Sequence, residues 1–464
     1  MKNFVATKNS KSSTQSIDQG RALLRKRAWR EGFSQLTNVD RVESLEASDL
    51  EELAKAAFLV GEGQNGSELL ARAHKDYLRE GRVCAAARCA FWLGFTALLN
   101  DKHAQANGWL ARAERLLADQ PDCVEKGYLL LPTGYRGVHS GDAAAAVTTF
   151  ERVAEIGRRF DDRDLTTLGL QGQGRALIRS GKVRRGVTLL DEAMVAVTAG
   201  EVSALVAGSV YCSVIDACGE IFDMRRAQEW TAALEQWCAS QPDVVPYRGH
   251  CRLRRAEILE LHGAWTAAME EASLANESFN DHRLAGAAVY RLAELHRLRG
   301  EFGEAEKAYQ QAAAGGRLQP GCALLRLAQG DVDTANAAIR RELAEVHRPD
   351  LRVWLLDAFV EIALAAKDVE AARNAANELL QISKRYDAPL LHAMAARATA
   401  TVFLAEYKTE AALAQLRQAW NLFAELDAPY EAGRTRALLG LAFRELKDDD
   451  AANSELNAAR ATSH

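Results

Sequence analysis

The stretch RGEFGEAEKAYQQAA, residues 299–313, carries the pattern that decides the fold. Small or apolar residues stand two, five, nine and twelve positions after Gly300, at Phe302, Ala305, Tyr309 and Ala312. Residues at these offsets share one side of an α-helix, because the helix completes a turn every 3.6 residues. The stretch therefore predicts a turn at Gly300 followed by an amphipathic helix.

The same offsets recur along almost the whole chain. A scan with this template finds twelve turn positions: Arg27, Gly61, Asp101, Gly141, Gly181, Phe222, Gly263, Gly300, Gly330, Lys367, Tyr407 and Lys447. Successive positions are 30 to 41 residues apart. A glycine at such a position ends a helix in a left-handed or open turn, and the small residue five later lets a partner helix approach closely. A period of this length is typical of stacked helical repeats.

Composition and length agree with a helical repeat. The 464 residues exceed the usual size of a single core, and 48% are hydrophobic, only 7% are aromatic, and eight are proline. This balance favours helices over strands. A formal net charge of −5 argues against a broad surface for nucleic acid or anionic membrane, because such a surface needs an excess of Lys and Arg.

At these offsets the chain resembles the tetratricopeptide-repeat (TPR) superfamily, whose second half-repeat has Gly, an aromatic residue, Ala, a large aromatic residue and Ala in the same register. The first helix matches less well, since Gln173 stands where Leu is expected before Gly174. The resemblance implies an all-α fold, a right-handed α-solenoid of about twelve TPR-like antiparallel helix pairs. In such a stack each repeat is expected to contact only its neighbours and to add to one curved groove.

Three stretches also resemble the repeat region of LuxR-type bacterial transcription regulators: AFWLGFTALL (90–99), GEVSALVAGSVYCSVIDACGEIFDMRRAQEWTAAL (200–234) and QPDVVPYRGHCRLRRAEILELHGAW (241–265). Members of that family usually end in a helix-turn-helix that binds DNA. The last predicted helix runs directly into ATSH and leaves no room for the roughly 60 residues of such a module. We therefore expect no direct nucleic-acid binding by this chain.

Two departures from the regular spacing guide the expected domains. The unit between Gly300 and Gly330 is short and contains GGRLQPG, so its first helix should begin near Pro320 and span about ten residues. We expect one solenoid part over residues 17–316 and a second over 317–464, after this kinked unit. The other departure is a proline-containing loop at 239–248. Residues 1–16 have little to bury and are expected to be disordered.

The eight cysteines lie in apolar helical patterns without a CxxC motif, which favours reduced core residues of a cytoplasmic protein. The pairs Cys84/Cys89 and Cys212/Cys218 are five and six residues apart, so each pair points to different helix faces. The N-terminus lacks the apolar segment of a secretory signal, and no apolar run approaches the roughly 18 residues of a membrane span. We expect no metal site and no membrane association.

Catalytic motifs are missing from the sequence. Neither a Walker loop nor HExxH, GxSxG or a dinucleotide fingerprint is present, and no pair of carboxyl groups stands out. We therefore predict a protein that is not an enzyme, with no catalytic residue and no cofactor. An enzyme would need convergent titratable groups that the sequence does not mark.

An arginine stripe is the first candidate for binding. Arg248, Arg252 and Arg255 recur at i, i+4 and i+7, which places them on one side of a helix. Such a stripe can grip a carboxylate-bearing ligand or an acidic peptide through charge-assisted hydrogen bonds. The alternative is a solvated face paired with Glu257 and Glu260.

Tyr211 and Asp216 are the second candidate, because the TPR resemblance places them on a first helix, and first helices line the concave wall of that fold. The alternative is a core tyrosine and a solvated aspartate. Together these features predict a non-catalytic protein-interaction or ligand-sensing scaffold that binds a protein or peptide, including an acidic one, or a small-molecule effector. The alternative function is the sensor region of a LuxR-type regulator whose DNA-binding domain is absent from this chain.

Overall fold

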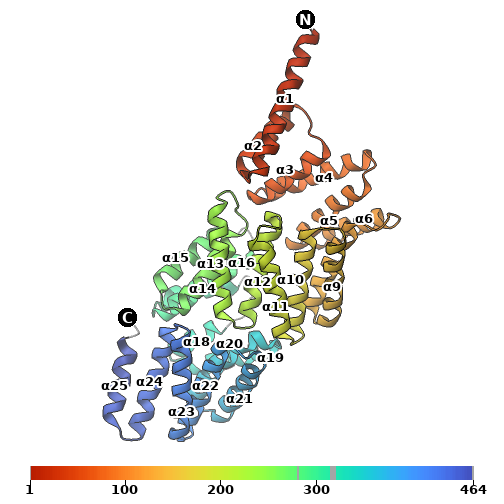
Figure 1. The fold of residues 1–464 in the computed structure, drawn as a ribbon. Coiled ribbons are helices and arrows are strands. Elements are labelled where there is room, and N and C mark those ends of the chain that lie inside the picture. Colours follow the sequence, from red (N-terminus) through yellow and green to blue (C-terminus); the bar gives the residue numbers. More distant parts are fainter. Residues whose placement is uncertain (1, 279–281, 314–319, 462–464) are drawn as a thin grey trace. The chain divides into compact units, whose positions relative to one another are not determined.

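The computed structural model describes residues 2–278, 282–313 and 320–461, and their regular secondary structure is entirely α-helical (Figure 1). From the N-terminus the helices are α1 (Lys2–Arg25), α2 (Trp29–Val42), α3 (Ala47–Leu59), α4 (Gly63–Arg79), α5 (Val83–Leu99), α6 (His103–Leu117), α7 (Val124–Tyr128), α8 (Leu131–Ser140), α9 (Ala143–Arg159), α10 (Arg163–Arg179), α11 (Val183–Thr198) and α12 (Ala204–Glu220). They continue with α13 (Met224–Ser240), α14 (Arg248–Leu261), α15 (Trp265–Ser278), α16 (His282–Leu298), α17 (Phe302–Ala313), α18 (Gly321–Ala328), α19 (Val332–Glu345), α20 (Pro349–Ala365), α21 (Val369–Tyr386), α22 (Pro389–Ala405), α23 (Thr409–Glu425), α24 (Pro429–Glu445) and α25 (Asp449–Ala461).

These helices form twelve antiparallel pairs, which confirms the predicted all-α solenoid. The first helix of the fourth pair is divided into α7 and α8, and Pro132 lies in the first turn of α8, where its missing N–H costs no helical hydrogen bond. The short unit also follows the prediction, because α18 begins directly after Pro320 and has eight residues. No helix among the described residues is long and apolar enough to span a bilayer.

All twelve predicted turn positions have a positive φ, from 56° at Asp101 to 92° at Gly141. The hydrogen bonds at Gly300 show how such a turn ends a helix. Its N–H donates to the carbonyl of Arg297 (3.1 Å), and the N–H of Glu301 donates to that of His296 (2.9 Å). These two bonds form a Schellman motif, which satisfies carbonyls that the helix itself leaves unpaired.

The residues at the template offsets form the interface between paired helices. Ala305, Tyr309 and Ala312 are at most 3% exposed, and Ala146 and Phe150 in an earlier pair are at most 2% exposed. Burial of these positions at the same register in separate pairs explains why one sequence template describes the whole chain.

The first helices of adjacent pairs lie against each other and form the inner wall of the stack. Such contacts join α5 to α7, α8 to α10, α16 to α18, α18 to α20, α20 to α22, and α22 to α24. Among the described contacts within each part of the chain, second helices of adjacent pairs do not approach as closely. A stack that is tighter on its first-helix side curves toward that side, so the first helices line the concave surface.

The chain divides into two compact units. Unit 1 comprises Met1–Val214 and Ala232–Arg248, and unit 2 comprises Ile215–Thr231 and Gly249–His464. The division expected near residue 316 falls within 314–319, outside the described residues. Helix α1 begins at Lys2, inside the segment for which the sequence predicts disorder.

Within unit 1, the loop predicted at 239–248 contacts helices near the N-terminus. The N–H of Val245 donates to the carbonyl of Leu59 (2.9 Å), and the indole N–H of Trp29 donates to the side-chain oxygen of Gln241 (3.2 Å). Leu59 also shares an apolar cluster with Val244. Repeats in unit 1 therefore contact more than their sequence neighbours.

Unit 2 shows the same departure from nearest-neighbour stacking. Trp265 at the start of α15 packs on Tyr430 of α24, and His262 lies 3.0 Å from a carboxylate oxygen of Asp427. The expectation that each repeat touches only its neighbours is wrong here, because the curved stack brings the turn after α14 against the turn before α24. The template could not reveal this, since it describes packing within a pair.

Candidate binding site: a charged wall on the first helices of unit 2

Charged side chains occupy the same register on two adjacent first helices of unit 2. They stand nine, six and three residues before the turn glycine: Arg254, Glu257 and Glu260 on α14, and Arg291, Glu294 and Arg297 on α16. Residues spaced by three lie near one another along a helix face. The repeat units therefore align two short rows of charge side by side.

Guanidinium groups connect these rows. Arg254 donates to Glu257 (2.6 Å) and also pairs with Asp216 of α12 (2.7 Å). Arg291 reaches from α16 to α14, where it donates to Glu260 (2.8 Å) and Glu257 (3.3 Å). Each arginine thus bridges the first helices of neighbouring pairs, and its planar fork suits contact with two carboxylates.

Glu294 lies at the centre of a buried group on α16 and α17. Arg297 donates to Glu294 (2.6 Å), and the hydroxyl of Tyr309 donates to its other carboxylate oxygen. Burial alone would raise the pKa of Glu294, but the charge and hydrogen bond of Arg297, with the tyrosine hydroxyls of Tyr309 and Tyr290, lower it. Glu294 is therefore held as a carboxylate.

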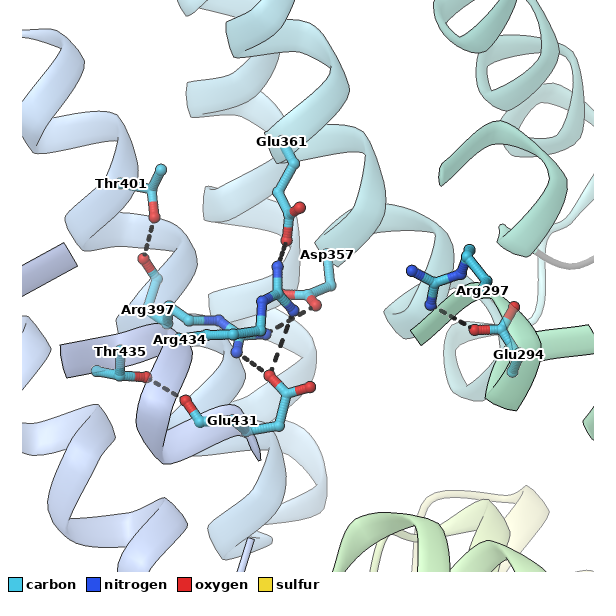
Figure 2. A network of polar contacts seen from close by, with 9 residues as sticks. All are labelled: Glu294, Arg297, Asp357, Glu361, Arg397, Thr401, Glu431, Arg434 and Thr435. Carbon is cyan, nitrogen blue, oxygen red and sulfur yellow. Dashed lines mark hydrogen bonds and ion pairs between the residues drawn. The ribbon is translucent and has the colours of Figure 1, made fainter. Parts of the chain in front are cut away.

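A second cluster joins α20, α22 and α24. Figure 2 shows Arg397 and Arg434 converging on Glu431, while Arg397 also contacts Asp357 (3.1 Å) and Arg434 contacts Glu361. Burial raises the pKa of Glu431, yet the two arginines outweigh it and bring the pKa to about 2. Burial prevails at Asp357, whose pKa is raised although Arg397 opposes the shift.

Arg297 belongs to the first cluster and also acts electrostatically on the second. In Figure 2 its side chain extends from α16 toward the cluster on α20 and α24, and its charge contributes to the lowered pKa of Glu431. We call the combined set the charged wall, which comprises Asp216, Arg254, Glu257, Glu260, Arg291, Glu294, Arg297, Asp357, Glu361, Arg397, Glu431 and Arg434.

Some side chains of the charged wall are partly exposed to solvent. The side chain of Arg434 is 33% exposed and that of Glu257 is 27% exposed, so solvent reaches both. Nevertheless burial is the largest influence on the pKa of each group. Both groups are therefore partly exposed to solvent and partly desolvated by the surrounding protein.

The charge balance of the wall is negative, with seven carboxyl groups and five guanidinium groups. At Glu260, burial and the nearby carboxylates outweigh Arg291, so its pKa is raised. The Nε–H groups of Arg254, Arg291 and Arg297 are buried and have no hydrogen-bond partner among the described residues. The wall therefore carries an excess of carboxyl groups over guanidinium groups.

Of the residues predicted from the sequence, Asp216 lies on the charged wall. Besides Arg254, it has the ring Nε2 of His250 at 3.2 Å. Tyr211 belongs to unit 1, is 3% exposed and packs against Trp237, with ring centroids 6.0 Å apart. The role of Tyr211 in binding stays a prediction.

The three arginines of the predicted stripe have separate surroundings. Arg248 lies in unit 1 and donates to the carbonyls of Val244 (2.8 Å) and Pro242 (2.7 Å), which fastens the preceding loop. In unit 2, Arg255 pairs with Glu271 of α15 (3.5 Å), and Arg252 is partly exposed on α14. The role of the stripe in binding stays a prediction.

The sequence contains a signal for the wall that the turn template does not read. Arg254 and Arg291 each begin the pattern Arg-x-Ala-Glu at the same distance from a turn glycine. Charges repeated at one register of a first helix mark a shared face. Arg397 gives a weaker signal, a single charge within the apolar run AMAARATATVFLA.

No family model matches the chain, and no curated protein matches it by sequence. Similar solved structures are TPR-type helical-repeat proteins. They include the APC/C hetero-tetramer Cut9–Hcn1 (TM-score 0.44, 13% identity, 96% of this chain and 92% of that chain), a Rap protein complexed with competence and sporulation factor (0.43, 12%, 81% and 97%), and the human IFIT1 dimer with PPP-AAAA (0.44, 14%, 91% and 92%). At these identities the likeness concerns the fold alone.

Proposed function

We propose that the chain is a non-catalytic protein-interaction scaffold that binds a peptide segment of its partner on the charged wall of unit 2. The observation that carries this proposal is the concentration of twelve charged side chains on the first helices of unit 2, where Arg434 and Glu257, among others, are partly exposed to solvent. Partly buried charged side chains cost folding free energy through desolvation. Binding of a partner to these side chains would explain why the protein has them.

The chemistry of the wall favours a basic peptide. Excess carboxylate attracts the Lys or Arg side chains of such a peptide. This differs from the acidic partner that the stripe of Arg248, Arg252 and Arg255 predicts. Both belong to the same class of function, a cytoplasmic scaffold without a cofactor.

Fluorescence anisotropy with two labelled decapeptides, oligolysine and oligoglutamate, tests the proposal. We expect saturable binding of oligolysine at low salt, weakened at least tenfold by Glu260→Gln or Asp357→Asn, because these carboxyls are incompletely neutralised. Glu378→Gln is the matched control, since Glu378 pairs with Arg352 away from the wall. Circular dichroism checks that each variant keeps its helicity.

Three results would contradict binding on the wall. The first is that oligolysine does not bind. The second is that Glu378→Gln lowers the affinity for oligolysine as much as Glu260→Gln or Asp357→Asn does. The third is that oligoglutamate binds and oligolysine does not. If oligoglutamate binds and Arg252→Glu abolishes that binding, the arginine stripe is the site.

We propose as the alternative that this chain is the sensor region of a LuxR-type transcription regulator. The similarity of residues 90–99, 200–234 and 241–265 to that repeat region supports it. Chromatin immunoprecipitation of the native protein tests this alternative. Enrichment at specific promoters supports regulation, whereas recovery of DNA no better than an untagged strain favours a scaffold unconnected with transcription.

A further inference from the structure

Two thiols and a carboxyl group meet in unit 1. Cys84 lies in the first turn of α5, Cys123 precedes α7, and Glu125 belongs to α7. The two sulfur atoms and one carboxylate oxygen of Glu125 all lie within 4.8 Å of one another. Contact between α5 and α7, which are first helices of adjacent pairs, brings the cysteines together across 39 residues of sequence.

The separations suit a small cation. With Zn–S bonds of about 2.3 Å, tetrahedral ligands lie about 3.7 Å apart, so small side-chain rotations would gather these three groups around one ion. Cys84 and Cys123 are both partly exposed, which gives an ion a path to the sulfur atoms. Thiolate and carboxylate are both ordinary zinc ligands.

Neighbouring side chains fix the carboxylate and the loop. Arg88 donates to one oxygen of Glu125 (3.0 Å), which orients the carboxylate in the way that outer contacts orient metal ligands. Lys126 donates to the carbonyl of Gln120 (2.8 Å) and so holds the turn that carries Cys123. These two hydrogen bonds therefore hold Glu125 and the turn that carries Cys123 in place.

We propose that Cys84, Cys123 and Glu125 form a binding site for a thiophilic divalent cation such as Zn²⁺, with water or a partner's group as the fourth ligand. Binding converts the two thiols into thiolates and releases two protons. No electron is transferred. The proposal is independent of the charged wall and of any partner bound there.

Titration of the reduced, metal-free full chain with Co²⁺ tests the site directly. We expect one equivalent to bind with sulfur-to-metal charge-transfer absorption in the near ultraviolet and to be displaced by Zn²⁺. Affinity should rise more than tenfold per pH unit, because two protons leave. Cys84→Ser and Cys123→Ser should each lower affinity at least tenfold, and Glu125→Gln should lower it less.

Cys322→Ser is the matched control, because Cys322 is an exposed thiol on α18. The proposal fails if no charge-transfer band appears, or if the control loses the band as the two cysteine variants do. Thiol counting before and after titration identifies oxidation, and loss of two thiols with no bound cobalt also overturns the proposal. Neither cysteine variant disturbs the Arg88–Glu125 pair, so the test remains decisive if Glu125→Gln fails to fold.

Discussion

Trp265 lies edge-on against Tyr430, with ring centroids 5.2 Å apart and ring planes at 69°. Trp265 begins α15 and Tyr430 lies in the first turn of α24, so four helix pairs separate them along the chain. Beside them, His262 and Asp427 approach to 3.0 Å. We call these two contacts the clasp of unit 2.

The clasp predicts measurable coupling between distant repeats. A double-mutant cycle of Trp265→Ala and Tyr430→Ala, measured by urea denaturation, should give a coupling energy of about 0.5–1.5 kcal/mol, because an edge-to-face pair stabilises beyond the area it buries. Leu441→Ala combined with Trp265→Ala is the control, since Leu441 is an exposed residue further along α24. Additive effects in the first cycle would show that the ring contact contributes nothing.

Removing strain at Tyr407 should stabilise the protein. This residue ends α22 with a φ of 59°, and its side chain is 87% exposed, so it has strain without the benefit of burial. Tyr407→Gly should raise the free energy of unfolding by about 1 kcal/mol, because glycine accepts a left-handed conformation. Tyr407→Ala removes the same ring but retains the strain. A stabilisation equal to that of the glycine variant would disprove this explanation.

Acid should weaken unit 2 through Glu431. The pKa of Glu431 is lowered to about 2 against a usual 4.5, so its contribution is complete above pH 4.5 and is lost as pH falls toward 2. Glu431→Gln should cost roughly 3 kcal/mol at pH 7. Chemical denaturation at several pH values should therefore give a wild-type advantage that shrinks below pH 4.5. An advantage that is constant down to pH 2.5 would contradict the assignment.

The effect of Glu342 on stability should have the opposite pH dependence. It stands twelve residues after Gly330, where the other units have an apolar residue, and burial raises its pKa to about 7. Its ionisation is penalised only in the folded state, so the penalty begins near pH 4.5 and is complete above pH 7. Glu342→Ala should therefore raise the melting temperature more at pH 8 than at pH 5. Glu345→Ala, in the same helix turn, serves as control, and an equal gain at both pH values would refute the prediction.

The fold could be predicted because it follows from local rules. One template of a turn and three positions that face the partner helix recurs along the chain, and every turn that it marks has a positive φ, including those at Arg27 and Phe222, which are not glycines. The sequence reveals such turns because the packing that surrounds them repeats.

The candidate site was less accessible to sequence reasoning. Asp216 could be predicted because the TPR resemblance places it on a first helix, but the turn template does not mark its partner Arg254. The meeting of Cys84 with Cys123 could not be predicted from spacing, because the two cysteines lie 39 residues apart in the sequence. In each case, the missing information is which side chains different repeats bring together, and no local pattern contains it.

The clasp changes how unit 2 responds to force. A stack of helix pairs without contacts between distant repeats extends gradually under low force, because small rotations at successive interfaces add up. In unit 2 the contact between Trp265 and Tyr430 must break before the stack can extend. We therefore expect little extension at low force and an abrupt extension once this contact breaks. A peptide too long to enter the fastened form would have to wait for it to open, so the opening rate would limit how quickly such a peptide is captured.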